Sequence, residues 1–237
     1  MDSLQNILSD VRVFLYGGVR TLPLTLAGTL LILGLFTANY AILFFLIGFL
    51  VLTPILAILL NGTVGTLLES FQISAFKTKT ADICRVILPF TTLQNSMGIR
   101  EENVVFSTWV AMVAFFIGYI FTNGMELHNR EAPSSQSPPS ADIEAKVSAR
   151  KSQALLAMGT VLVFALLVIR FRMYSGCENI YSIILTFLAF FSLGYGWYRM
   201  LSSVGEDRLS DLFGIANRLL PPSATDNGPI ACIPMPV

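Results

Sequence analysis

The sequence predicts an all-α integral membrane bundle with about five transmembrane helices and amphipathic helices at both ends. Charged residues are 13% of the 237 residues and hydrophobic residues are 54%, whereas a soluble domain has roughly 25% charged residues. Residues 21–60 contain no charge, and three further uncharged runs follow. A bilayer core of about 30 Å needs about 20 helical residues, so these runs predict five crossings. The 15 basic and 15 acidic residues cancel, which leaves no net field to attract nucleic acid.

Residues 1–20 are expected to form an amphipathic N-terminal segment. Apolar residues recur there at helical spacing, with polar residues on the other face. Gly17-Gly18 should end this helix, which would lie on the membrane surface. The alternative is a flexible terminus that is merely rich in leucine. The apolar positions are Leu4, Ile7, Leu8, Val11, Phe14 and Leu15.

Residues 21–60 are expected to form a transmembrane hairpin. The polar group Thr37-Ala38-Asn39-Tyr40 divides the run into spans at 22–38 and 41–60, because Asn tolerates tight turns and Tyr suits the interface. Pro54 in the second span should kink the helix and not break it. No small-residue cleavage site separates the two spans, so we expect the first to be retained and not removed as a signal peptide.

A membrane-proximal loop at 61–102 precedes the third transmembrane helix at 103–125. The sequon Asn61-Gly62-Thr63 abuts the second span, so we expect no glycan there. The loop should begin helically, because its first apolar residues share one helical face. These residues are Val64, Leu67, Leu68 and Phe71.

A Ser/Pro-rich linker at 126–151 has the composition of a solvated segment without a core. The fourth helix should begin in the last part of this linker. The fourth and fifth transmembrane helices occupy 152–200, with uncharged runs at 152–169 and 179–198.

Five spans place the two termini on opposite sides of the membrane. Eight of the 15 basic residues then fall on the N-terminal side and seven on the other, so the positive-inside rule decides little. Arg12 and Arg20 lie next to the first span, whereas the hairpin turn beyond it is uncharged. This asymmetry favours a cytosolic N-terminus.

The last segment, 201–237, is expected to be an amphipathic helix followed by a proline-containing tail. The helix should run from Asp207 to Leu220 and stop at Pro221-Pro222. Its polar stripe includes Asp207, Ser210, Asp211, Asn217 and Arg218. Its apolar stripe is a candidate surface for docking a partner, although a second membrane-surface helix without a partner is the alternative. The apolar stripe consists of Leu209, Leu212, Phe213, Ala216, Leu219 and Leu220.

The sequence predicts no catalytic, cofactor-binding or metal-ligating residues. No ionisable residue lies inside a predicted span, which argues against ion-coupled transport. His128, the one histidine, is expected to be a surface residue of the linker, and the three cysteines have no metal or redox spacing. A lipid-modifying enzyme would have to draw its polar groups from the 61–102 loop. The candidates there are Lys77, Lys79, Asp82, Arg85 and Arg100.

Pairs of small residues at four-residue spacing predict close helix packing. The pairs are Gly34/Ala38, Ala114/Gly118 and Ser192/Gly196.

Four short motifs carry a resemblance to a known group of proteins. They are Arg150-Lys151-Ser152-Gln153 before a span, Gly176-Cys177-Glu178 in the next loop, Gly194-Tyr195-Gly196-Trp197-Tyr198 at the end of the last span, and Asp211-Leu212-Phe213-Gly214-Ile215 before a tail that contains Cys232. In order and position they resemble multi-span membrane proteins of nucleocytoplasmic large DNA viruses, over roughly residues 103–235. Trp109 in the third span is also consistent with this resemblance.

The resemblance implies an inner-membrane or minor capsid component without assigned catalysis. We expect no cofactor. Its partners would be the lipid bilayer and other capsid or membrane proteins of the particle. We therefore expect a structural protein that tethers a viral internal membrane to the capsid shell. A membrane-embedded lipid-modifying enzyme is the alternative, and a small channel or transporter is a third possibility.

Overall fold

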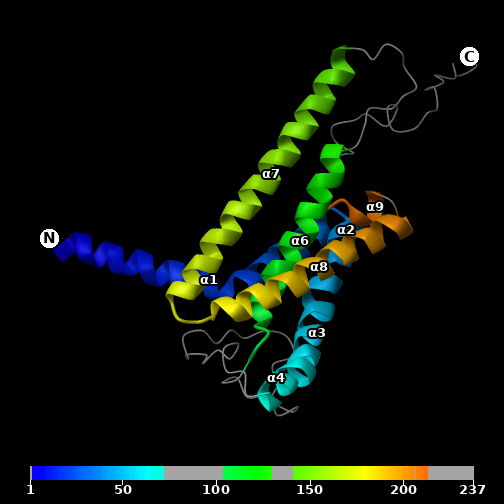
Figure 1. The fold of residues 1–237 in the computed structure, drawn as a ribbon. Helices are drawn as coiled ribbons and strands as arrows, with labels where there is room; N and C mark the ends of the chain where they lie inside the picture. Colours follow the sequence, from blue (N-terminus) through cyan, green and yellow to red (C-terminus); the bar gives the residue numbers. More distant parts are fainter. Residues whose placement is uncertain (1, 72–103, 130–140, 206, 213–237) are drawn as a thin grey trace, which may run out of the picture.

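The structure, a computed structural model, confirms an all-α chain (Figure 1). It describes residues 2–71, 104–129, 141–205 and 207–212. Five of its helical segments are long and apolar enough to cross a membrane, as the sequence predicts. They are Gly17–Phe36, Tyr40–Leu68, Thr108–Asn129, Val147–Tyr174 and Ile180–Val204.

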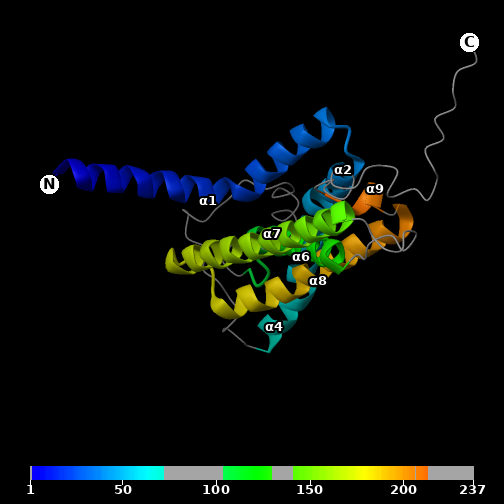
Figure 2. The ribbon, with the colours of Figure 1, turned by 90° about the horizontal axis from the view of Figure 1, so that it is seen from above.

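The first helix, α1 (Asp2–Phe36), is one uninterrupted helix of 35 residues. The prediction that Gly17-Gly18 ends a separate helix is therefore wrong. A glycine costs a helix about 1 kcal/mol, but an unsatisfied backbone group in lipid costs several kcal/mol, so continuing the helix is favourable. Pro23 lies inside α1 and removes one backbone hydrogen bond. Figure 2 shows that α1 bends along its length.

A tight turn joins α1 to the second span, as predicted. The amide of Asn39 donates to the carbonyl of Gly34 at 3.0 Å, and the amide of Ala38 donates to that of Leu35 at 3.3 Å. This pair of bonds is the Schellman motif, whose central residue has a left-handed backbone; that residue is Ala38, with φ of 48°. The Asn39 side chain then caps the next helix by accepting from the Ala41 and Ile42 amides at 3.0 and 3.4 Å.

The second span is a continuous rod of alternating α- and π-helical segments. They are α2 (Tyr40–Ile47), η1 (Gly48–Leu52), α3 (Thr53–Leu60), η2 (Asn61–Gly65) and α4 (Thr66–Ser70). Pro54 stands in the first turn of α3, directly after η1, where the wider π turn accommodates its missing amide hydrogen. The Thr53 hydroxyl donates to the Gly48 carbonyl at 2.9 Å. Pro54 therefore leaves the helix unbroken, as expected.

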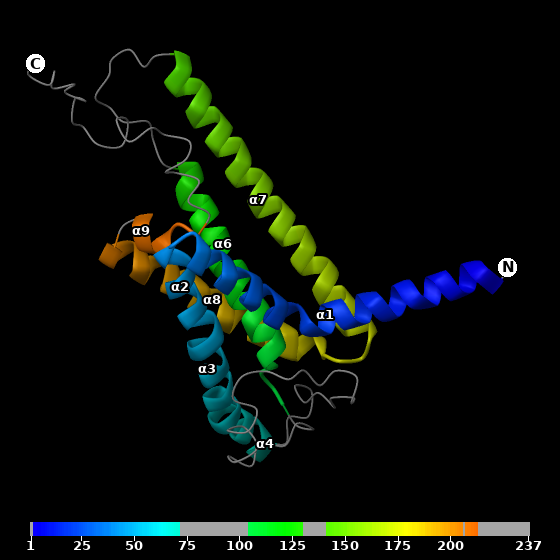
Figure 3. The same ribbon diagram turned by 180° about the vertical axis from the view of Figure 1, so that it is seen from behind.

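The expected helical start of the membrane-proximal loop is confirmed, because the rod continues as far as Ser70. Val64 and Leu68 pack against the core, whereas Leu67 and Phe71 are exposed. Figure 3 shows α2, α3 and α4 following one another along this rod.

The helix α6 (Thr108–Asn129) lies in the middle of the bundle (Figure 1). Most of its residues are buried. It packs against α7 (Ala141–Tyr174), α8 (Ile180–Gly205) and the α2–α3 rod. The helix ends four residues later than the predicted span at 103–125, so His128 belongs to α6 and not to the linker. The fourth helix begins at Ala141, inside the predicted linker at 126–151, as expected.

Aromatic rings fill the centre of the bundle where α2, η1 and α6 meet. Phe45 is fully buried, and its ring centroid lies 5.5 Å from that of Phe49, 5.7 Å from that of Phe115 and 5.0 Å from that of Tyr119. The Tyr119 ring packs edge-on against Tyr198 of α8 at 5.2 Å. These contacts connect three of the spans through one cluster.

The tail begins with the short helix α9 (Asp207–Ser210). The predicted helix from Asp207 to Leu220 is wrong in its described part, because Asp211 and Leu212 are not helical. Residues 213–237 lie outside the described part of the chain.

Candidate functional site

Several polar side chains that lie between the helices form two groups along α6. One group, the α7–α8 turn cluster, consists of Ser107, Trp109, Arg172, Cys177 and Glu178. The second group, the tail contact, consists of Tyr119, Asn123, Ser210 and Asp211. A single residue, Asn61, forms a third site near the start of α6.

The backbone at the end of α7 creates the turn cluster. The Gly176 amide donates to the Met173 carbonyl at 3.0 Å, and the Cys177 amide donates to the Arg172 carbonyl at 3.1 Å. These bonds form a second Schellman motif, in which Gly176 has the required left-handed backbone with φ of 71°. The turn brings Glu178 back to Arg172, six residues earlier in the sequence.

Arg172 and Glu178 form a buried ion pair. Arg172 Nη2 lies 2.8 Å from Glu178 Oε1, and the two side chains are only 5% and 4% exposed. The Ser107 hydroxyl donates to the same carboxylate oxygen at 2.6 Å, and the Arg172 guanidinium lies 4.6 Å from the centre of the Trp109 ring. The two charges therefore neutralise each other, and the pair joins the start of α6 to the α7–α8 turn.

Cys177 directly precedes Glu178 in the turn and is 4% exposed. The structure has Cys177 in a disulfide bond. The Ser175 hydroxyl also contacts the Cys177 sulfur at 3.2 Å. The other two cysteines, Cys84 and Cys232, lie outside the described residues.

Asn61 uses both atoms of its side-chain amide to hold the segment before α6. Its nitrogen donates to the carbonyls of Ala57 and Phe106 at 2.9 and 2.8 Å. Its oxygen accepts from the amides of Val105 and Phe106 at 3.1 and 2.8 Å. Asn61 is 5% exposed, and the absence of a glycan at this sequon stays a prediction.

Ser182 of α8 holds the same segment from the other side. Its hydroxyl donates to the Val105 carbonyl, and its side chain is buried. The segment at 105–106 is thus bound by the second span and by the fifth.

The tail contact fixes α9 against the other half of α6. The Tyr119 hydroxyl donates to the Ser210 carbonyl at 2.9 Å, and the Asn123 amide nitrogen donates to Asp211 Oδ1 at 3.4 Å. Ser210 and Asp211 are 1% and 4% exposed. The prediction that they belong to the polar stripe of a surface helix is therefore wrong, because the chain folds back onto α6 at this point.

Only two of the six residues of the predicted docking stripe, Leu209 and Leu212, lie in the part of the chain that the structure describes. Leu212 is buried in the same core as Phe45 and Tyr119, and Leu209 packs against that core. Phe213, Ala216, Leu219 and Leu220 lie outside the described residues. Docking of a partner to this stripe stays a prediction.

The other candidates from the sequence do not join these clusters. His128 is half-buried at the end of α6, and its Nδ1 lies 3.5 Å from the Lys151 carbonyl oxygen. The five polar candidates for an enzyme, Lys77, Lys79, Asp82, Arg85 and Arg100, lie outside the described residues. Within the described ranges, no three His, Cys, Asp or Glu side chains are grouped so that they could hold a metal ion.

The sequence did not predict that the segment before α6 is held in place by buried polar side chains from other spans. These side chains are Asn61, Arg172, Glu178 and Ser182. The one available signal was Gly176 directly after an apolar helix, which predicts a Schellman turn and therefore the return of Glu178 toward Arg172. The contacts of Asn61 and Ser182 join residues 44 to 77 positions apart, which no local pattern encodes.

Comparisons with protein-family models, with curated proteins and with solved structures found no match to this chain. Composition and structure together identify it as an integral membrane helical protein.

Proposed function

We propose that this chain is a structural, non-enzymatic membrane protein that tethers a viral internal membrane to a capsid shell. The observation that supports the structural role is how the buried polar side chains are used. Asn61, Tyr119, Ser182 and the Arg172–Glu178 pair each join separate parts of the chain. An active site directs polar groups toward a substrate, whereas these groups bind the chain's own backbone and side chains. Such use is typical of a scaffold.

The capsid part of the proposal rests on the resemblance to membrane proteins of nucleocytoplasmic large DNA viruses. Two of the motifs that carry it contain residues on which the geometry of this bundle depends: Gly176-Cys177-Glu178 forms the α7–α8 turn, and Gly194 lies where α6 and α8 cross. The partners are then the lipid bilayer and other capsid or membrane proteins of the particle, without nucleic acid. The protein would reside in the virion internal membrane and in a host membrane during assembly.

The tail is the proposed contact with the shell. Leu209 and Leu212 anchor its beginning on the bundle, so the remaining apolar residues of the predicted stripe are the ones we assign to docking. These residues are Phe213, Ala216, Leu219 and Leu220, outside the described part of the chain. Burying each large side chain against a partner would contribute about 1.5–3 kcal/mol.

The test uses full-length chains in infected cells, followed by purification of particles and detergent extraction of their membrane. Phe213→Asp places a carboxylate on the proposed docking face, and Asn217→Asp places the same charge on the predicted polar stripe. We expect the Asn217→Asp protein to remain with the extracted shell and the Phe213→Asp protein to be lost, with equal membrane insertion of both. Equal retention of the two variants would remove docking from the tail, and absence of the wild-type chain from particles would overturn the structural role.

A further inference from the structure

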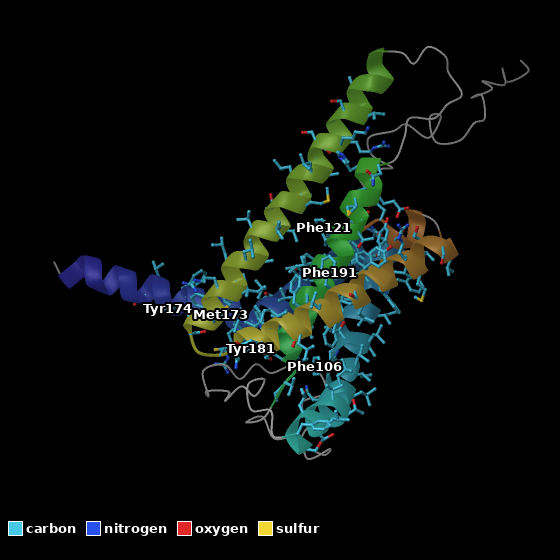
Figure 4. The ribbon with its side chains drawn as sticks, in the orientation of Figure 1. Phe106, Phe121, Met173, Tyr174, Tyr181 and Phe191 are labelled. Carbon is cyan, nitrogen blue, oxygen red and sulfur yellow. The ribbon has the colours of Figure 1, made fainter. Side chains whose placement is uncertain are left out.

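The α7–α8 turn and the start of α6 lie at the same end of the bundle. Ser107, just before α6, donates to Glu178 of the turn. In Figure 4, the labelled Met173, Tyr174 and Tyr181 flank this turn. Buried polar groups from the third and fourth spans therefore meet beside it.

Two nitrogen donors of this cluster, Trp109 Nε1 and Arg172 Nε, are buried and have no hydrogen-bond acceptor in the part of the chain that the structure describes. Trp109 and Arg172 are only 2% and 4% exposed. A buried donor without an acceptor costs free energy, and a buried indole N–H usually has a partner. The guanidinium carbon lies 4.6 Å from the centre of the indole ring, so the two donors border one small volume.

The chemistry of this volume restricts what can bind there. Both unpaired groups are donors, so the ligand must accept hydrogen bonds. Arg172 and Glu178 already neutralise each other, so an anion would bring an uncompensated charge into a buried site. The ligand is therefore a small, neutral oxygen acceptor. A buried water has this chemistry, and it typically makes about three hydrogen bonds to polar groups that lack other partners.

We propose that one water molecule is bound between Trp109 and Arg172. Its oxygen accepts from the indole N–H and from the guanidinium Nε–H, and one of its hydrogens is donated to the carboxylate of Glu178. The described hydrogen bonds of Glu178 both end on Oε1, which leaves Oε2 to accept from the water. The water adds a further link between the start of α6 and the end of α7. It does not depend on the tethering role.

A rotation of the Glu178 carboxylate is the competing arrangement. It would bring Oε2 to Arg172 Nε and make the ion pair bidentate. The indole N–H of Trp109 would then still lack an acceptor. The indole proton of Trp109 therefore distinguishes the two arrangements.

The test uses the full-length chain in detergent micelles with ¹⁵N-labelled tryptophan. The chain has two tryptophans, and Trp197→Phe assigns their indole signals. Contacts with water are measured by nuclear Overhauser spectroscopy in the laboratory frame and in the rotating frame. We expect a cross peak between the Trp109 indole proton and water with opposite signs in the two frames, because a bound water contacts this proton without exchanging with it. A peak of equal sign in both frames, which reports proton exchange, or the absence of a peak would overturn the proposal.

Two variants locate the bound water. Ser107→Ala removes a hydroxyl whose exchanging proton would imitate water, and we expect the cross peak to remain. Arg172→Met combined with Glu178→Leu removes the other polar partners of the water, and we expect the cross peak to disappear while the helical circular dichroism is kept. Loss of the peak in Ser107→Ala, or its persistence in the double variant, would overturn the assignment of the site.

Discussion

Gly118 of α6 and Gly194 of α8 let the backbones of the two helices meet directly. A Cβ atom at Gly118 would lie 2.3 Å from the Phe191 carbonyl oxygen, and a Cβ atom at Gly194 would lie 2.3 Å from the Phe115 carbonyl oxygen. Both distances are far shorter than any van der Waals contact. The α6–α8 crossing therefore requires glycine at both positions, in keeping with the small residues at helix interfaces in membranes.

Gly118→Ala and Gly194→Ala should each destabilise the bundle. The added methyl group meets backbone and not a flexible side chain, so the helices must move apart, at a cost of about 1–3 kcal/mol. Thermal unfolding of the purified chain in detergent, followed by circular dichroism, measures this loss. Gly196→Ala is the matched control, because nothing lies within 4 Å of a Cβ atom there. Since alanine is the better helix former, the control should be at least as stable as the parent.

Asn61→Ala should detach the segment before α6 from the second span. The substitution leaves the buried amides of Val105 and Phe106 without their acceptor, at a cost of about 1–3 kcal/mol for each. Thr63→Ala is a suitable control because it removes the same sequon at an exposed position. Hydrogen exchange of residues 104–107 in detergent should rise strongly in Asn61→Ala and not in Thr63→Ala. Unchanged protection in both would contradict the clamping role of Asn61.

Composition predicts the spans correctly because partition into lipid depends on the apolar length of a segment and hardly on its neighbours. The hairpin turn at 37–39 was also readable, since its polar residues and its Asn cap are local signals. The prediction that a helix ends at Gly17-Gly18 is wrong because it relied on helix propensity in water. In lipid, an unpaired backbone group costs more free energy than a glycine inside a helix does, so the helix continues.

The packing could be predicted only in part. The small pair Ala114/Gly118 is buried in α6 as predicted, and Gly34 lies close to Ile42. In α8, however, the interface residue is Gly194 and not Gly196. Two residues turn a helix by about 200°, so the choice between these glycines depends on how α8 is rotated against α6. This rotation is set by contacts between residues that are distant in sequence. The hydrogen bonds of Asn61 and the contact of Asp211 with Asn123 likewise join distant parts of the chain, so no local pattern predicts them.

Ala38→Gly should stabilise the hairpin turn. Ala38 has a left-handed backbone, which costs a residue with a Cβ atom about 1–2 kcal/mol and costs glycine little. Because glycine also has more freedom in the unfolded chain, we expect a net gain of less than 1 kcal/mol. Thermal unfolding in detergent against the parent checks the sign. A lower melting temperature would mean that the turn is not closed by a Schellman motif in the folded protein.

The last prediction concerns the coupling between Arg172 and Glu178. Replacing either residue alone leaves an uncompensated charge in a buried site, which should cost about 3–5 kcal/mol. Replacing both at once, as Arg172→Met with Glu178→Leu, removes both charges and should restore much of that loss. The double-mutant cycle, measured by unfolding in detergent, should therefore give a large coupling energy.

The pair Arg199–Glu126 provides the control cycle. Its two atoms lie 3.4 Å apart, but the side chains are 57% and 33% exposed, so water and salt screen the interaction. We expect a coupling much smaller than that of Arg172–Glu178, and one that falls with added salt, whereas the buried pair should be nearly insensitive to salt. Similar couplings in the two cycles would show that the α7–α8 turn cluster is open to water and does not hold the turn against α6.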